Sequence, residues 1–271
     1  MILAIDVSNT NITLGTFRGE EIQRIYRITT KVPRTSDEYG VLLRDLVRLS
    51  GASYRDIKGI IVDTVVPNVM YSLINGCIKY IGVEPIIVGP GVKTGVKVRA
   101  ENPKEAGADL IVNAAAVKEL YGGPAIVIDY GTATSYQLVL EDGTLDSVVL
   151  APGIQTSVQA FTAEAARIGD VEIRKPSTIL TKETTECIQA GVVYGTIGET
   201  EYIVRKIKEQ SGIPNLKVIA TGGLGKVISD ETDVIDIYDP NLTLQGLRII
   251  YNKNKPKSRR VSAAAGDKAK E

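Results

Sequence analysis

The chain has 271 residues, of which 44% are hydrophobic and 24% charged, and its 32 basic residues balance 32 acidic ones. It is long enough to bury a large core in one long domain or in two of about 100–150 residues. A net charge of zero gives no overall field that would recruit nucleic acid or an anionic membrane. Histidine is absent, which excludes Ser-His-Asp and Cys-His nucleophiles, histidine zinc sites and histidine bases. Acid–base chemistry is therefore left to Asp, Glu, Lys or Tyr.

The sequence indicates neither secretion nor a membrane span. No basic leader precedes the first apolar segment, and no apolar run approaches the ~20 residues that cross a bilayer. Cys77 and Cys187 lie in apolar segments with a helical pattern and form no C-x-x-C pair, which fits a reducing compartment. We expect a soluble cytoplasmic protein that binds neither nucleic acid nor a membrane.

The chain opens with a strand, an aspartate and a turn. An apolar run from Ile2 to Ile5 ends at Asp6, and the small polar residues 7–11 follow. This pattern predicts a strand and a turn. A second strand is predicted at 12–17, and the glycine within 18–20 suits a hairpin that reverses it.

The same pattern returns in the second half of the chain. The apolar run Ala125 to Ile128 ends at Asp129, and a turn and an alternating stretch to Leu140 follow. The offset between the two aspartates is 129 − 6 = 123 residues. Such repetition predicts two halves of similar build, each opening with a hairpin that carries an aspartate at its first turn.

The segments around these two units alternate between strand and helix patterns, which predicts mixed α/β sheets. Helices are expected at 37–51, 68–80, 103–121, 184–210 and 242–251, and strands at 59–66, 85–88 and 217–220. The helix at 103–121 would bridge the halves. We divide the chain into an N-terminal half, 1–115, a C-terminal half, 116–251, and a tail, 252–271. The tail has seven basic residues against two acidic ones and is expected to be disordered.

Each aspartate unit suits phosphate binding. Small residues after a buried strand let backbone N–H groups and hydroxyls approach phosphate oxygens, while the aspartate orients a cation or its waters. Two such loops facing each other would hold a nucleotide polyphosphate. An Asx-type turn that closes the hairpin is the alternative for either loop alone, but the repetition at matched positions favours the nucleotide site.

Three further motifs have two interpretations each. Thr221-Gly222-Gly223 is a close-approach turn for a ring or sugar, or an ordinary loop turn. The segment from Gly89 to Gly95 contains Lys93 but lacks Walker spacing, so it is a loop lining a cleft or a plain connector. Asp109 could accept the proton of an attacking hydroxyl, or it is a surface aspartate favoured by a helix dipole.

Together these motifs resemble the type III pantothenate kinases, which belong to the acetate and sugar kinase, heat-shock ATPase and actin superfamily. The resemblance runs from Ile2 to about Tyr251. It is carried by Asp6-Val7-Ser8-Asn9-Thr10-Asn11, Thr35-Ser36-Asp37-Glu38-Tyr39-Gly40, Val65-Val66-Pro67, Gly89 to Gly95, Asn102-Pro103, Gly107-Ala108-Asp109, Asp129-Tyr130-Gly131-Thr132-Ala133-Thr134, Ala151-Pro152-Gly153 and Thr221-Gly222-Gly223.

The resemblance implies duplicated actin-like (ribonuclease H-like) α/β domains, with mixed sheets flanked by helices and a cleft between the halves. It implies ATP-dependent phosphorylation of pantothenate to 4'-phosphopantothenate, the first step of coenzyme A biosynthesis, by a homodimer that uses Mg²⁺ with ATP. Asp109 would be the general base, and Asp129 would bind a monovalent cation, K⁺ or NH₄⁺. The implied ATP-binding residues are Asp6, Val7, Ser8, Asn9, Thr10, Asn11, Ile12, Thr13 and Thr132, and the implied substrate-binding residues are Gly107, Ala108, Asp109, Leu110 and Thr184.

Several positions depart from the family pattern where ligands are expected. Ser8 replaces a glycine of the first loop, and Leu110 replaces an arginine suited to the pantothenate carboxylate. The others are Ala100 for tyrosine, Ser147-Val148 for two glycines, and Thr181-Lys182-Glu183-Thr184 for Gly-Lys-Asn-Thr. Lys93 or Arg99 could replace the lost cation. Two alternatives stay open: a catalytically impaired nucleotide-binding paralogue with a regulatory or scaffold role, and a kinase for another small alcohol.

Overall fold

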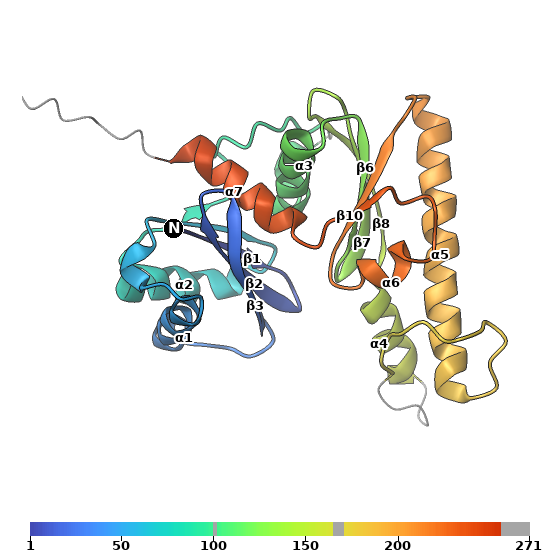
Figure 1. Ribbon diagram of the computed structural model, residues 1–271, viewed down its shortest axis with the longest axis horizontal. Helices are drawn as coiled ribbons and strands as arrows, with labels where there is room; N and C mark the ends of the chain where they lie inside the picture. Colours follow the sequence, from blue (N-terminus) through green and yellow to red (C-terminus); the bar gives the residue numbers. More distant parts are fainter. Residues whose placement is uncertain (100–101, 165–170, 256–271) are drawn as a thin grey trace, which may run out of the picture.

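Two five-stranded sheets of the same topology form the protein, whose computed structural model describes residues 1–99, 102–164 and 171–255 (Figure 1). The first sheet has the order β3 (Glu21–Thr29), β2 (Asn11–Arg18), β1 (Ile2–Val7), β4 (Gly59–Thr64) and β5 (Ile86–Ile87). The second has the order β8 (Leu145–Pro152), β7 (Ala133–Val139), β6 (Ala125–Tyr130), β9 (Lys217–Thr221) and β10 (Ile237–Tyr238). The central strands β1 and β6 each pair antiparallel with their hairpin partner and parallel with a later strand. The predicted duplication with mixed sheets is confirmed.

Helices occupy the segments between the strands. The first half contains α1 (Ser36–Leu49), the 3-10 turn η1 (Tyr54–Asp56), α2 (Pro67–Gly76), the π turn η2 (Cys77–Ile81), the 3-10 turn η3 (Pro103–Glu105) and α3 (Ala108–Leu120). The second contains α4 (Ile154–Glu164), α5 (Thr184–Ser211), α6 (Gly225–Ser229) and α7 (Leu242–Asn254). The helix predicted over 103–121 is wrong at its start. Ala106 and Gly107 have extended ψ angles of 126° and 143°, so α3 begins only at Ala108.

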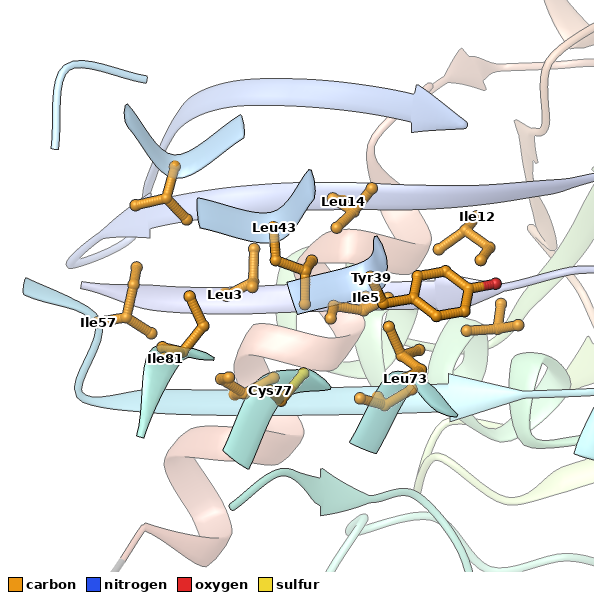
Figure 2. Packing of buried hydrophobic residues seen from close by; sticks show 14 residues of the cluster. Leu3, Ile5, Ile12, Leu14, Tyr39, Leu43, Ile57, Leu73, Cys77 and Ile81 are labelled. Atoms are coloured by element: carbon orange, nitrogen blue, oxygen red, sulfur yellow. The ribbon is translucent and has the colours of Figure 1, made fainter. Parts of the chain in front are cut away.

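The outer face of the first sheet carries an apolar core under α1 and α2 (Figure 2). Thr35 starts α1, because its hydroxyl accepts the Glu38 N–H at 3.3 Å while the Glu38 carboxylate accepts the Thr35 N–H at 2.7 Å. Tyr39 and Leu43 lie one turn apart on the buried side of α1 and pack in the same cluster as Leu73 of α2. This packing fixes the face of the sheet that is turned away from the second half.

Between the two sheets lies a middle layer made of α3 and α7, which contact each other (Figure 1). Val112 and Ala115 of α3 pack with the inner face of the first sheet, whereas Ala114 and Val117 pack with the inner face of the second. A Cβ at Gly246 of α7 would fall on the carbonyl oxygen of Val112, so the two helices cross closely only because this residue is glycine. α3 is therefore buried against both halves, and its position is fixed by both.

The two hairpins differ by one residue in their turns. Val7 pairs with Ile12 across four intervening residues, whereas Tyr130 pairs with Thr134 across three. The offset is 129 − 6 = 123 on the first strand of each hairpin but 135 − 13 = 122 on the second, since Asp6 faces Thr13 and Asp129 faces Ser135. The constant offset of 123 predicted from the sequence therefore holds for the aspartates and ends at the turns.

The remaining expectations concern the cysteines, membrane spans, the tail and the domain boundary. The two cysteines are free, as their spacing predicted: Cys77 is buried and Cys187 is exposed on α5. In the described part of the chain, no helix combines the length and the apolar character needed to cross a membrane. Ala100 and the tail from residue 256 onward lie outside the described residues. The domain boundary at 115/116 stays a prediction. α7, from the C-terminal range, contacts β1, β2 and β4 of the first sheet.

We expect Leu73→Ala to lower the free energy of unfolding by about 2–5 kcal/mol, because the side chain is fully buried between α2 and the first sheet and the change leaves a cavity. Leu49→Ala, at the end of α1, is the matched control. Its side chain is 66% exposed, so the loss should stay within about 0.5 kcal/mol. Urea denaturation of both variants measures the difference, and equal losses would contradict the packing described here.

Candidate active site

Three aspartates stand at the carboxyl ends of central strands and face the middle layer. Asp6 on β1 lies directly opposite Asp63 on β4, and Asp129 holds the equivalent place on β6. The residues two positions earlier on each of these strands pack in the clusters that contain α3. Because side chains two residues apart share a face of a strand, the three carboxylates point toward α3. Carboxyl ends of parallel strands are where open α/β sheets bind their ligands.

Asp109 joins this group from the first turn of α3. Gly107 precedes the helix, and a Cβ there would fall on the Asp109 carboxylate, so the glycine leaves room for it. Burial raises the pKa of Asp109, while the N–H groups of Leu110 and of Asp109 itself lower it. The carboxylate of Asp109 also raises the pKa of Asp6, Asp63 and Asp129, which places all four within electrostatic reach of one another.

Asp6 is held by the loop that follows it. The pKa of Asp6 is raised to about 7, mainly by burial. A hydrogen bond from Ser8 opposes this shift, and the charges of Asp129 and Asp109 add to it. The Ser8 hydroxyl donates to Asp6 Oδ1 at 3.0 Å. Among the described residues other than glycine, only Asn215 has a positive φ, so Ser8 has a backbone conformation open to any residue. The serine at this glycine position is thus accommodated without backbone strain and partners the aspartate.

Asp63 was missed by the sequence prediction, although its signal is present. The apolar run from Gly59 to Val62 ends at Asp63, just as the runs before Asp6 and Asp129 end in aspartate, but the strand was predicted to continue to residue 66. The side chain is 1% exposed, and its Oδ1 has no hydrogen-bond partner among the described residues. Burial, and then the charges of Asp6 and Asp109, raise the pKa of Asp63 well above its ordinary value.

Asp129 is tied to both helices of the middle layer through Asn113, a second residue that sequence reasoning missed. Asn113 donates from Nδ2 to Asp129 Oδ2 at 3.0 Å and accepts the Thr243 hydroxyl at 2.8 Å. Burial raises the pKa of Asp129 to about 6, although the bond from Asn113 lowers it. A lone polar residue inside the apolar, alanine-rich run of α3 was the available signal for Asn113.

The two predicted phosphate loops meet. The hydroxyls of Thr10 and Thr132 lie 3.2 Å apart, so the turn after Asp6 touches the turn after Asp129. Thr156 donates its hydroxyl to the carbonyl oxygen of Thr132 at 2.7 Å. A Cβ at Gly153 would fall on the carbonyl oxygens of Gly131 and Thr132, so the Ala-Pro-Gly segment approaches the second loop because it ends in glycine. These contacts bring the two halves of the predicted ATP site together.

The Thr221-Gly222-Gly223 turn lies beside the second loop, because Thr221 pairs with Asp129 at the end of β9. Gly222 has φ +95°, and a Cβ there would come within 2.6 Å of Tyr130 backbone atoms. Its conformation and its contacts with the Tyr130 backbone both require glycine, and the approach of a ring or sugar to this turn stays a prediction.

Two other predicted segments are not brought to the carboxylates. The backbone N–H of Lys93 donates to Asn254 Oδ1 at 2.9 Å, and Asn254 is the last residue of α7. Thr243, which donates to Asn113, lies at the start of the same helix. At 1.5 Å per residue, Asn254 and Thr243 are about 16 Å apart. Thr184 begins α5 at the end of the second half that is far from α3 (Figure 1). The head group of Arg99 pairs with Asp146 at 2.6 Å.

Leu110 and Val148, two of the departures from the family pattern, belong to the same apolar cluster. Both are partly buried and pack against its core, together with Val98. Where the family pattern has an arginine and a glycine, this chain therefore has two side chains that pack against the same apolar cluster.

The carboxylates suit a cation that also binds phosphates. Within the described residues, no three Asp, Glu, Cys or His side chains are placed to hold a metal ion on their own. Mg²⁺ is commonly held by one or two carboxylates, waters and substrate phosphates, and Asp6 with the two loops fits that set. Hollows of about 650 and 530 Å³ lie over α1 and α5, and none of the four carboxylates lines them. The convergence of groups, not the hollows, therefore locates the site.

A duplicated α/β fold with two facing loops and an aspartate at the end of each central strand defines the class of the protein as actin-like in fold. A solved structure from Sinorhizobium meliloti, provisionally described as a 2-dehydro-3-deoxygalactonokinase, shares this fold with a TM-score of 0.55. It is 11% identical, over 97% of this chain and 99% of that one.

The family model described as type III pantothenate kinase matches residues 2–206. A type III pantothenate kinase from Agathobacter rectalis is 52% identical over 257 residues, which cover 95% of this chain and 99% of the relative. One from Geobacillus kaustophilus is 46% identical over the same shares. The chain belongs to the type III pantothenate kinase family.

The buried carboxylates predict an unusual pH dependence of stability in the absence of ligands. A carboxyl whose pKa is higher in the folded state stabilises the protein below its unfolded pKa, and this stability is lost as the pH rises through the folded value. For Asp6 the loss should fall between about pH 4 and 7 and reach up to about 4 kcal/mol. Urea titrations in EDTA at pH 5 and 7.5 should show a fall that Asp6→Asn reduces. An equal fall in both proteins would contradict the assignment.

Proposed function

We propose that the protein phosphorylates pantothenate with ATP, forming 4'-phosphopantothenate in the first step of coenzyme A biosynthesis. The observation that carries the proposal is the meeting of the two phosphate loops, at Thr10 and Thr132, beside a carboxylate at the start of α3. Phosphoryl transfer needs positioning and charge stabilisation more than covalent chemistry. Membership of the family supports pantothenate as the acceptor.

The loops after Asp6 and Asp129 would hold the polyphosphate between them. Residues 6–13 and Thr132 supply backbone N–H groups and hydroxyls, and a polyphosphate entering there would separate the Thr10 and Thr132 hydroxyls. Asp6, kept in place by Ser8, would hold the Mg²⁺ that accompanies ATP. When bound, this ion neutralises negative charge on the phosphates.

Asp109 would act as the general base for the pantothenate hydroxyl. Its raised pKa makes it a better proton acceptor than an exposed aspartate, and Gly107 leaves space beside it. Gly107, Ala108 and Leu110 are proposed to line the acceptor site next to it. Asp129, half-buried and partnered by Asn113, is proposed to hold K⁺ or NH₄⁺.

A homodimer is proposed from the exposed apolar side chains near the start of α5. Phe161 of α4 is 54% exposed, and Ile179 and Leu180, just before α5, are 59% and 84% exposed. α4 and α5 contact each other, and α4 and the start of α5 lie toward the same end of the molecule (Figure 1). A second copy would cover this end, and the family resemblance sets the substrate sites near such an interface. A cytoplasmic location stays a prediction.

A kinase for another small alcohol is the second candidate. The leucine at position 110 favours it, because Leu110 packs in an apolar cluster and offers no cation to the carboxylate of pantothenate. The impaired nucleotide-binding paralogue is the third candidate and predicts no pantothenate binding with or without nucleotide.

We expect Asp109→Asn to lower kcat for ATP and pantothenate by about 10²–10⁴-fold, because the amide cannot accept the hydroxyl proton. ATP affinity, measured by calorimetry, should stay unchanged. Asp142→Asn is the matched control. Asp142 is an exposed aspartate in the turn between β7 and β8, where it pairs with Lys97 and is not one of the four aspartates of the site. A coupled assay with K⁺ or Na⁺ measures both variants, and K⁺ should raise the rate of the unmodified enzyme.

Full turnover by Asp109→Asn would remove its role as base. No turnover of pantothenate by the unmodified chain, with turnover in a screen of other alcohols, would replace the proposed substrate. ATP binding without any turnover or pantothenate binding would favour the impaired paralogue.

We expect sedimentation velocity to give a mass near twice that of one chain, and Leu180→Arg to shift it to the monomer by placing a charge in the apolar contact. Leu49→Arg, at the exposed end of α1, is the control and should leave the dimer intact. A monomeric unmodified protein would contradict the proposed assembly.

A further inference from the structure

A buried carboxylate beside Asp6 has no assigned role in the proposed reaction. Asp63 is 1% exposed, and its Oδ1 finds no hydrogen-bond donor in the described part of the chain. Burying a carboxylate with an unpartnered oxygen and no opposite charge is costly, so the side chain needs either a proton or a cation. β4 does not need a carboxylate at this position to form, because the residues before Asp63 in the strand are glycine or apolar.

The position of Asp63 points to a cation that is shared with Asp6. The two residues are direct neighbours in the parallel pairing of β1 with β4 and lie on the same face of the sheet. The charges of Asp109 and Asp129 raise the pKa of both carboxyls, so negative charge gathers around the pair. The basic residue that acts on Asp6, Arg27, is exposed on β3 and is the weakest of the influences on it. The pair is therefore short of positive charge.

We propose that Asp63 joins Asp6 in binding the divalent cation that enters with the nucleotide. Mg²⁺ is typically held by one or two carboxylates, with waters and substrate phosphates completing its shell, so a pair of carboxylates at the edge of a phosphate loop fits it. This composition agrees with the finding that, within the described residues, no group of three Asp, Glu, Cys or His side chains could hold a metal ion. The inference rests on the proposed ATP site but adds a residue that the family resemblance does not carry. Asp63 is then a metal-binding residue of this chain in its own right.

The direct test measures metal binding without turnover. Mn²⁺ serves as the probe, and its affinity is measured by electron paramagnetic resonance with the full chain, with and without ADP. We expect Asp63→Asn to weaken Mn²⁺ binding in the presence of ADP by roughly tenfold or more, a loss typical of altered metal sites. Thr16→Val is the matched control. Thr16 is also buried with an unpartnered oxygen on the same sheet, but it pairs with Leu3 at the other end of β1.

An unchanged Mn²⁺ affinity in Asp63→Asn would overturn the inference, because a carboxyl that merely shares a proton with Asp6 predicts that result. A similar loss in Thr16→Val would overturn it as well. If Asp63→Asn does not fold, anomalous diffraction from crystals of the unmodified protein with Mn²⁺ and ADP decides. A peak within about 5 Å of an Asp63 oxygen, the reach of one bridging water, supports the assignment, and a peak elsewhere overturns it.

The result is independent of the substrate. Pantothenate turnover with unchanged Mn²⁺ binding in Asp63→Asn would leave the proposed function standing and remove the role of Asp63. A loss of Mn²⁺ affinity in a chain that does not phosphorylate pantothenate would do the reverse.

Discussion

The burial of α3 between the two sheets is the constraint from which the site follows. Its small apolar residues contact both halves, and Gly246 lets α7 cross it closely. Because the helix cannot shift toward either sheet without losing contacts to the other, its first turn is held where the central strands end. Asp109 is thereby brought to Asp6 and Asp129, which lie 103 and 20 residues away along the chain, by packing alone.

The same arrangement concentrates negative charge in a place of low dielectric. Burial raises the pKa of each of the four aspartates, and their mutual repulsion raises it further in Asp6, Asp63 and Asp129. Hydrogen bonds from Ser8 and Asn113 offset part of this cost at two of them. A polyphosphate adds still more negative charge, so cations must accompany it. The clustering of four aspartates and the cation requirement of the proposed reaction therefore point to the same need for positive charge at this place.

Much of this could be predicted from the sequence, because the pattern of an apolar run closed by aspartate is local. It gave the duplication, both loops and the ends of β1 and β6. The start of α3 could not be found in this way, since only the extended backbone at Ala106 and Gly107 separates η3 from the helix. Asp63 follows the same local pattern but was hidden by a strand predicted two residues too long. The contact between Thr10 and Thr132 depends on how the halves pack, which no local pattern encodes.

The departures from the family pattern separate into two groups once the structure is known. Ser8 lies in the nucleotide part of the site, and its hydroxyl supports Asp6 there, so this change is compatible with phosphate binding. Leu110 and Val148 pack against one apolar cluster, where the family pattern has an arginine and a glycine. Neither side chain offers a cation, so the change removes a charge-assisted partner for a carboxylate. The change at Ser8 is therefore compatible with the proposed nucleotide site, whereas selectivity for the proposed acceptor depends on how its carboxylate is met without that arginine.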